Sequence, residues 1–288
     1  MKSHKAGLSV AVILLSTPAW AVPQLKDAES ISAVIAAMTP EEKAALVTGT
    51  GINNAEKVAG AAGSTFAIPR LGIPQIVFAD GPVGVRLGAG PTGGEKRFAS
   101  AFPVSIAMAA TWDPALIQRV GGAIGDEAKQ YGVDLMLGPA INIQRNPLNG
   151  RNFEYFSEDP WLNAMITVSY INGMQAQGVG AVVKHFAANN QETRRQTVNE
   201  IISPRALREI YFPGFEYAME KAQPWAVMSS YPSINGTPAS QNAWLLKDVL
   251  RTQWKFNGLV MSDWYGVSDP VRALSLIHIS EPTRRVVI

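Results

Sequence analysis

The sequence contains no cysteine among its 288 residues. Disulfide frameworks, thiol nucleophiles and cysteine-ligated metal sites are therefore excluded. Charged residues make up only 17% of the chain, and the formal net charge is +2. We find no basic stripe and no interleaved basic and aromatic run, so nucleic acid is not an expected partner. Metal-ligand spacing and a dinucleotide fingerprint are also missing, so we expect no metal and no cofactor.

Long hydrophobic runs are missing as well. The most apolar segment near the N-terminus, residues 8–15, is well short of the ~20 residues that a membrane-spanning helix needs. Two lysines precede it, and the small-x-small tripeptide Ala19-Trp20-Ala21 follows it. This order is typical of a secretory signal, here residues 1–21, and predicts export to the periplasm or beyond the cell. The competing interpretation is a membrane anchor; once the signal is cleaved, we expect no membrane association.

Apolar and helical stretches alternate along residues 22–273. Hydrophobic residues account for 47% of the chain, enough for a sizeable core. Short apolar runs cover residues 76–79, 134–137, 180–183, 225–228 and 259–261, and helical stretches cover residues 114–131, 163–177, 204–221 and 243–254. Such alternation predicts βαβ units around a parallel sheet. With five units and no dinucleotide fingerprint, we expect an α/β fold of the (β/α) TIM-barrel type rather than an open doubly wound sheet.

Polar side chains stand at the ends of these apolar runs. The segment from Gly258 to Trp264 passes from an apolar strand directly into the carboxylate of Asp263. On this segment alone, Asp263 is either a catalytic group at a strand end or the N-cap of the next helix. In a barrel the strand ends converge on one mouth, so we expect a single site there. The other residues of that site are Asp80 with Arg86, Arg151, Lys184 with His185, and Tyr231.

The composition of this site fits a neutral, polyhydroxylated substrate. Carboxylates accept hydrogen bonds from adjacent hydroxyl groups, Arg and Lys donate to them, and a ring such as Trp264 packs on the apolar face of a sugar. Glycoside hydrolysis needs one carboxylate as nucleophile or base and a second carboxyl group as acid. Other interpretations stay open: Asp80-Gly81-Pro82 as a plain turn, Lys184 as a Schiff-base lysine, and the acidic residues between positions 154 and 159 as a helix-capping cluster.

Five segments, in order, resemble the active-site motifs of glycoside hydrolase family 3, in its bacterial β-glucosidase branch. They are Asp80 through Arg86, Arg151 through Pro160, Lys184 through Glu192, Met228 through Tyr231, and Val249 through Arg251 followed by Gly258 through Trp264. The resemblance implies that residues 22–273 are the N-terminal barrel domain of such an enzyme. Ala187-Ala188-Asn189-Asn190 stands where the branch that cleaves N-acetylglucosamine has a Gly-Pro-rich motif, which argues against that activity.

The resemblance also implies roles for single residues. Asp263 would be the nucleophile of a retaining double displacement on terminal β-glucosides or oligosaccharides, with Trp264 packed on the sugar. Arg195 and Tyr231 would lie beside Asp263, and Arg195 would favour its ionised form. Five residues from earlier strand ends would hold the hydroxyl groups of the terminal glucosyl unit: Asp80, Arg86, Arg151, Lys184 and His185.

The C-terminal residues break this pattern. Residues 274–284 resemble the translation of a transposase-type sequencing adapter, so we expect residues 274–288 to be a non-native tail. In the family, the acid/base Glu lies in a second α/β domain, and no residue of this chain matches that motif. We therefore expect a barrel incomplete at its C-terminal end, whose partner is the missing C-terminal domain of its own full-length chain. The alternative is an inactive fragment that only binds sugar.

Overall fold

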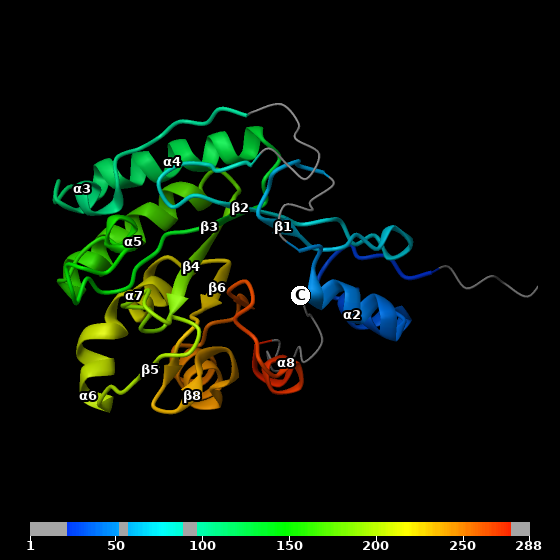
Figure 1. The fold of residues 1–288 in the computed structure, drawn as a ribbon. Helices are drawn as coiled ribbons and strands as arrows, with labels where there is room; N and C mark the ends of the chain where they lie inside the picture. Colours follow the sequence, from blue (N-terminus) through cyan, green and yellow to red (C-terminus); the bar gives the residue numbers. More distant parts are fainter. Residues whose placement is uncertain (1–21, 52–56, 89–96, 278–288) are drawn as a thin grey trace, which may run out of the picture.

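The structure is a computed structural model that describes residues 22–51, 57–88 and 97–277. The predicted signal segment and residues 278–288 of the predicted tail lie outside the described residues. In Figure 1 a curved sheet occupies the centre, and helices cover its outer side. These helices are α3 (Ser105–Ala109), α4 (Pro114–Gln130), α5 (Pro160–Gln175) and α7 (Pro213–Lys221). Within the described residues, no helix is both long and apolar enough to cross a membrane.

The central sheet has six strands in the order β1-β2-β3-β4-β6-β9. They are β1 (Gly63–Ser64), β2 (Val77–Asp80), β3 (Leu135–Leu137), β4 (Gly180–Phe186), β6 (Ala226–Ser229) and β9 (Leu259–Ser262). Every pairing from β2 to β9 is parallel, whereas β1 joins β2 in antiparallel orientation. The five parallel strands coincide with the five apolar runs, so the prediction of repeated βαβ units is confirmed.

Both faces of the parallel strands are apolar because each face meets a different hydrophobic cluster. One cluster lies on the face turned away from the helices and contains Phe78, Leu135, Leu137, Val182, Ala226 and Met228. The alternate residues belong to the larger cluster shared with the helices: Ala79, Met136, Ala181, Val183, Val227 and Val260. Since side chains along a strand alternate between faces, this double burial explains why the runs are continuous rather than alternating.

Within the residues that the structure describes, the curved sheet does not close. Strands β1 and β9 are its two edges, and α8 (Pro270–Ile277) follows β9. A cavity of about 350 Å³ lies at this seam, lined by residues of α2 (Pro40–Thr48), β1, β9 and α8. Figure 1 shows α2 and α8 on the same open side of the sheet. The fold is the predicted (β/α) barrel, incomplete at this seam, and α8 runs through the boundary predicted at residue 273.

Two predicted helical stretches have a more complex form. Residues 204–221 are divided into α6 (Pro204–Ala206), the π-helical η3 (Leu207–Tyr211) and α7. Pro213 lacks an amide hydrogen and is suited to the first turn of a helix, so it ends one segment and begins the next. The stretch predicted over residues 243–254 is the π-helical η5 (Trp244–Gln253).

Short elements surround the barrel. Helices α1 (Ile31–Ala37) and α2 precede it, and Thr39 caps α2 by accepting a hydrogen bond from the Glu42 amide at 3.2 Å. A second sheet contains β5 (Asn199–Glu200), β7 (Ser233–Ile234) and β8 (Thr237–Pro238). The remaining turns are η1 (Pro69–Leu71), η2 (Asn152–Glu154) and η4 (Ala239–Gln241).

Helices α4 and α5 cross with their backbones in contact. A Cβ atom on Gly173 of α5 would overlap the carbonyl oxygen of Gln118 in α4. This close crossing places Tyr170 beneath the loop after β2, where its hydroxyl donates a hydrogen bond to the Pro82 carbonyl oxygen at 2.8 Å. The helix pair therefore supports the loop that begins at Asp80.

Gly173→Ala is expected to destabilise the fold by about 1–3 kcal/mol, because the added methyl group forces the two backbones apart. Gly122→Ala is a matched control, since its Cβ would lie 3.6 Å from the Gln177 side chain, an ordinary contact. The control should be neutral or stabilising by up to ~1 kcal/mol, because Ala favours helix. Chemical unfolding of both variants provides the measurement, and equal stabilities would contradict the close crossing.

Candidate active site

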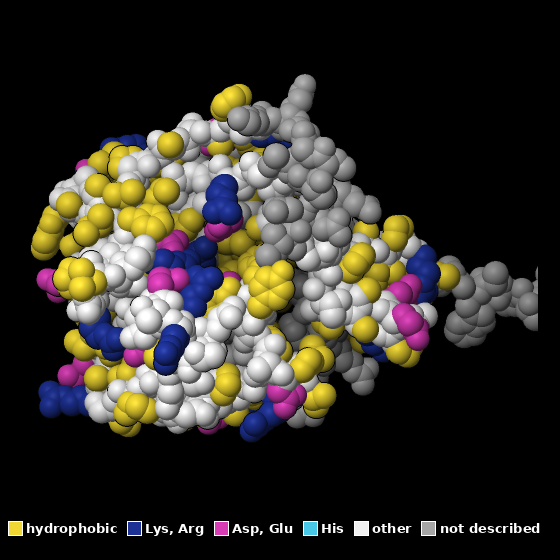
Figure 2. All heavy atoms as spheres, viewed as in Figure 1, with side chains coloured by type: hydrophobic (Ala, Val, Ile, Leu, Met, Phe, Trp, Pro, Cys, Tyr) yellow, Lys and Arg dark blue, Asp and Glu magenta, His cyan; other side chains and the backbone are white. Residues whose placement is uncertain are grey.

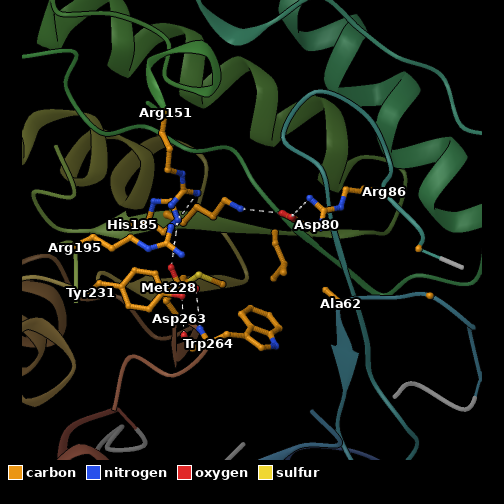
Figure 3. Close-up of a pocket in the computed structure, with 14 residues that line it drawn as sticks. Ala62, Asp80, Arg86, Arg151, His185, Arg195, Met228, Tyr231, Asp263 and Trp264 are labelled. Carbon is orange, nitrogen blue, oxygen red and sulfur yellow. Dashed lines mark hydrogen bonds and ion pairs between the residues drawn. The ribbon is translucent and has the colours of Figure 1, made fainter. Parts of the chain in front are cut away.

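The carboxyl ends of the parallel strands surround a cavity of about 430 Å³. In Figure 2 basic and acidic side chains gather around a hollow in the middle of the face, and Figure 3 shows the side chains that point into the cavity. All nine residues predicted for the site line it: Asp80, Arg86, Arg151, Lys184, His185, Arg195, Tyr231, Asp263 and Trp264.

Asp80 ends β2 and is ion-paired on both sides. The chain turns back at Gly81, where a Cβ atom would overlap the Gly84 carbonyl oxygen, and the Arg86 amide then bonds to the Asp80 carbonyl oxygen at 2.8 Å. As a result, Arg86 Nη1 lies 3.5 Å from Asp80 Oδ2, while Lys184 Nζ lies 3.1 Å from Oδ1. Burial by itself raises the pKa of Asp80, but Lys184 and then Arg86 lower it below its usual 3.8. The segment is therefore both a turn and part of the site.

Two consecutive residues of β4, Lys184 and His185, enter the cavity. A regular strand would send them to opposite faces. The pairing of β4 with β6 shifts between Lys184 and Phe186, and an irregularity of this kind re-aims side chains locally. Asn142 fixes the distorted backbone, because its side chain accepts from the His185 amide at 3.0 Å and donates to the His185 carbonyl oxygen at 2.9 Å.

The His185 ring is held in one neutral tautomer. Asn142 Nδ2 donates to the His185 carbonyl oxygen, so Oδ1 is the atom that faces His185 Nδ1 at 3.2 Å, and Nδ1 carries the hydrogen. His185 Nε2 then accepts from Arg151 Nη2 at 3.0 Å. Burial, together with the charges of Arg151, Lys184 and Arg195, lowers the pKa of His185 well below its usual value. The ring is therefore neutral at physiological pH.

Asp263 follows β9 and its side chain is only 11% exposed. Oδ1 accepts a hydrogen bond from the Trp264 amide at 2.8 Å, and Oδ2 lies 3.6 Å from His185 Nε2. Burial raises the pKa of Asp263 above its usual 3.8, although Lys184 and the Trp264 amide oppose that rise. The next helix, α8, is capped by Asp269, which accepts from the Arg272 amide at 3.1 Å. The N-cap interpretation of Asp263 is therefore wrong.

Tyr231 and Arg195 form the wall beside this carboxylate. The Tyr231 hydroxyl donates to the Trp264 carbonyl oxygen at 2.7 Å, and the Arg195 guanidinium lies 4.6 Å from the centre of the Tyr231 ring. Arg195 Nη1 also pairs with Glu192 Oε2 at 2.7 Å. The resemblance implied that Arg195 favours ionisation of Asp263; its guanidinium is engaged by Glu192 and Tyr231 instead of contacting that carboxylate directly.

The sequence analysis did not assign three polar residues that hold the site: Asn142, Glu154 and Glu192. Glu154 is buried and pairs with Arg151, whereas only Asp159 of the predicted capping cluster caps α5, accepting from the Leu162 amide at 2.6 Å. Each glutamate stands three residues from an arginine of the site, and that i,i+3 spacing is the signal that could have identified both. Among the described residues, no cluster of His, Asp and Glu could hold a metal ion.

The chain is similar in sequence to known proteins. A sequence profile described as the glycosyl hydrolase family 3 N-terminal domain matches residues 49–278. A beta-glucosidase of Rhizobium radiobacter is 50% identical over 236 residues, covering 82% of this chain and 27% of that protein. An exo-alpha-(1->6)-L-arabinopyranosidase of Bifidobacterium longum is 47% identical over 232 residues, covering 79% of this chain and 29% of that protein.

The fold is also similar to solved structures. Beta-glucosidase 3B from Thermotoga neapolitana, solved in complex with glucose, superposes with a TM-score of 0.82 at 51% identity, covering 86% of this chain and 35% of that one. The chain thus spans about a third of the length of the relatives that it matches. The region matched by the profile contains all nine site residues. This chain belongs to glycosyl hydrolase family 3 and carries its N-terminal domain.

Proposed function

We propose that this protein hydrolyses terminal β-glucosidic bonds with retention of configuration, and that Asp263 is the nucleophile. The observation that carries the proposal is a buried carboxylate at the rigid end of β9, which lines a cavity rich in hydrogen-bonding groups. Relatives named beta-glucosidases, and a solved relative in complex with glucose, support the substrate class.

The side chains opposite Asp263 suit the hydroxyl groups of one sugar unit. Asp80 stays ionised between Lys184 and Arg86 and accepts hydrogen bonds from adjacent hydroxyls, while the two cations donate. The single acceptor of neutral His185, Nε2, accepts from Arg151 Nη2, so the ring holds that guanidinium in place beside the sugar. Trp264 supplies an aromatic face for the apolar side of the ring.

Asp263 attacks the anomeric carbon through a carboxylate oxygen. The bond to the leaving oxygen breaks as the glycosyl ester forms, and water later displaces the ester from the other face, which gives net retention. Oδ1 is tied to the Trp264 amide, which leaves Oδ2 directed toward the cavity as the attacking atom. The neighbouring positive charges of Lys184 and Arg151 favour the ionised form that attack requires.

A second carboxyl group must protonate the leaving group. Asp80 is the other carboxylate that lines the cavity within the described residues, and its lowered pKa makes it unsuitable as an acid near neutral pH. We therefore propose that the acid/base comes from polypeptide outside the described residues, in line with the C-terminal domain expected from the sequence. On its own, the chain would attack activated glucosides and stall as the glycosyl-enzyme.

We also propose export, directed by residues 1–21.

The first test uses dinitrophenyl β-glucoside, whose leaving group needs no proton. The 288-residue chain should release about one equivalent of dinitrophenolate per site in a burst, because attack needs only the nucleophile. Asp263→Ala should lower the burst rate by at least ~10³-fold. Glu209→Gln is the control, because Glu209 forms an exposed surface pair with Arg205. If the burst survives in Asp263→Ala, Asp263 is not the nucleophile. If dinitrophenyl α-L-arabinopyranoside gives a faster burst than the glucoside, the substrate is an arabinopyranoside rather than a glucoside.

The second test compares the two carboxylates through unfolding free energies between about pH 2 and about pH 7, because the lowered pKa of Asp80 affects stability only below about pH 4. The raised pKa of Asp263 means that the folded protein loses stability as pH rises through this window, so Asp263→Asn should become progressively more stable than the wild type. The lowered pKa of Asp80 has the opposite sign. Asp80→Asn should be less stable at neutral pH, and the difference should shrink only as pH falls below the usual pKa of 3.8. The same pH trend in both variants would contradict these assignments.

A further inference from the structure

We propose that Glu192 is a positioning residue that holds the two active-site arginines, Arg151 and Arg195, and sets the balance of charge around Asp263. The proposal rests on the proposed function and extends it to a residue that is not among those lining the cavity. Glu192 touches neither Asp263 nor the space for the sugar, so it acts through the side chains that it contacts.

The Glu192 carboxylate lies between the two guanidinium groups. Oε2 is 2.7 Å from Arg195 Nη1, and Oε1 is 3.8 Å from Arg151 Nη1. Oε1 also accepts from Asn189 Nδ2 at 3.1 Å. Asn189 is fully buried, and its side-chain amide is fixed because Nδ2 also donates to the Tyr155 hydroxyl at 3.1 Å, while that hydroxyl donates to the Asn189 backbone carbonyl oxygen at 3.0 Å. The orientation of the carboxylate is thus set by a buried amide, with one oxygen directed to each arginine.

Each arginine connects Glu192 to the surroundings of Asp263 through one further side chain. Arg151 Nη2 donates to His185 Nε2 at 3.0 Å, and that nitrogen lies 3.6 Å from Asp263 Oδ2. On the other side, the guanidinium of Arg195 lies over the ring of Tyr231, whose hydroxyl donates to the carbonyl oxygen of the residue after Asp263. A displacement of Glu192 would therefore disturb both sides of the nucleophile.

Glu192 also limits the positive potential at Asp263. The ionisable groups that line the cavity with Asp263 are Asp80, Arg86, Arg151, Lys184, Arg195, Tyr231 and the neutral His185. Arg151 is also paired with Glu154. Within the described residues, by contrast, Glu192 is the one carboxylate that forms an ion pair with Arg195. Removing the charge of Glu192 would leave Arg195 uncompensated and favour the ionised form of Asp263. It would also release the Arg195 guanidinium from its fixed orientation and remove one of the two carboxylates beside Arg151.

The loss of charge compensation and the loss of arginine orientation should change different measured quantities. The burst rate with dinitrophenyl β-glucoside is measured as a function of pH. Glu192→Gln keeps the shape of the side chain and removes its charge. The rate on the pH-independent plateau should therefore fall about 10–100-fold, because the arginines are less well oriented. Its acid limb should move to lower pH, because Asp263 ionises more readily. Glu192→Asp keeps the charge, so it should leave the acid limb in place while still lowering the plateau. Glu209→Gln serves again as the control.

A measurement without substrate separates this inference from the proposed function. Asp263→Asn should stabilise the Glu192→Gln protein less than it stabilises the wild type near neutral pH, because the ionised Asp263 is better compensated when Glu192 is neutral. Additive unfolding free energies would overturn the coupling whatever the activity. If Glu192→Gln does not fold, the same cycle with Glu192→Asp should be additive, and coupling there would contradict the proposal. Absence of any wild-type burst would instead reject the proposed function.

Discussion

The burial of one ionisable carboxylate, Asp263, is the constraint around which this site is organised. A carboxylate removed from water is costly unless charges or hydrogen bonds compensate it. Lys184 and Arg151 supply positive charge, and the Trp264 amide supplies a hydrogen bond, yet burial still prevails and the pKa stays above its usual value. A sugar bound beside Asp263 would meet a nucleophile that is held in place but incompletely stabilised, which is a reactive arrangement.

The same residue type has the opposite character a short distance away. Asp80 has a lowered pKa because Lys184 and Arg86 contact its two oxygens directly. Under the proposed function, two aspartates at two strand ends take two tasks, Asp80 as a permanent anion that binds hydroxyl groups and Asp263 as the nucleophile. The surroundings of each aspartate, rather than its residue type, set the direction of its pKa shift and therefore its task. The irregular pairing of β4 makes this possible, because it directs Lys184 and His185 into the same cavity.

Much of this arrangement could be predicted because its signals are local. Continuous apolar runs identified the parallel strands, and the polar residue at the end of each run identified the site, since a barrel brings strand ends together. Asn142, Glu154 and Glu192 were not assigned, because their importance lies in contacts that only the folded chain creates. The break at Pro213 and the irregularity at Lys184 were missed for a related reason, since neither alters the hydrophobic period of its segment.

The proposed mechanism requires Asp263 to become covalently bonded to the sugar. The most direct measurement is to inactivate the protein with a deoxyfluoro β-glucoside carrying dinitrophenolate, digest it, and locate the adduct by peptide mass spectrometry. We expect a single glycosylated peptide with the modification on Asp263. An adduct on Asp80, Glu192 or Lys184 that forms at the rate at which the protein loses activity would contradict the assignment of Asp263 as the nucleophile.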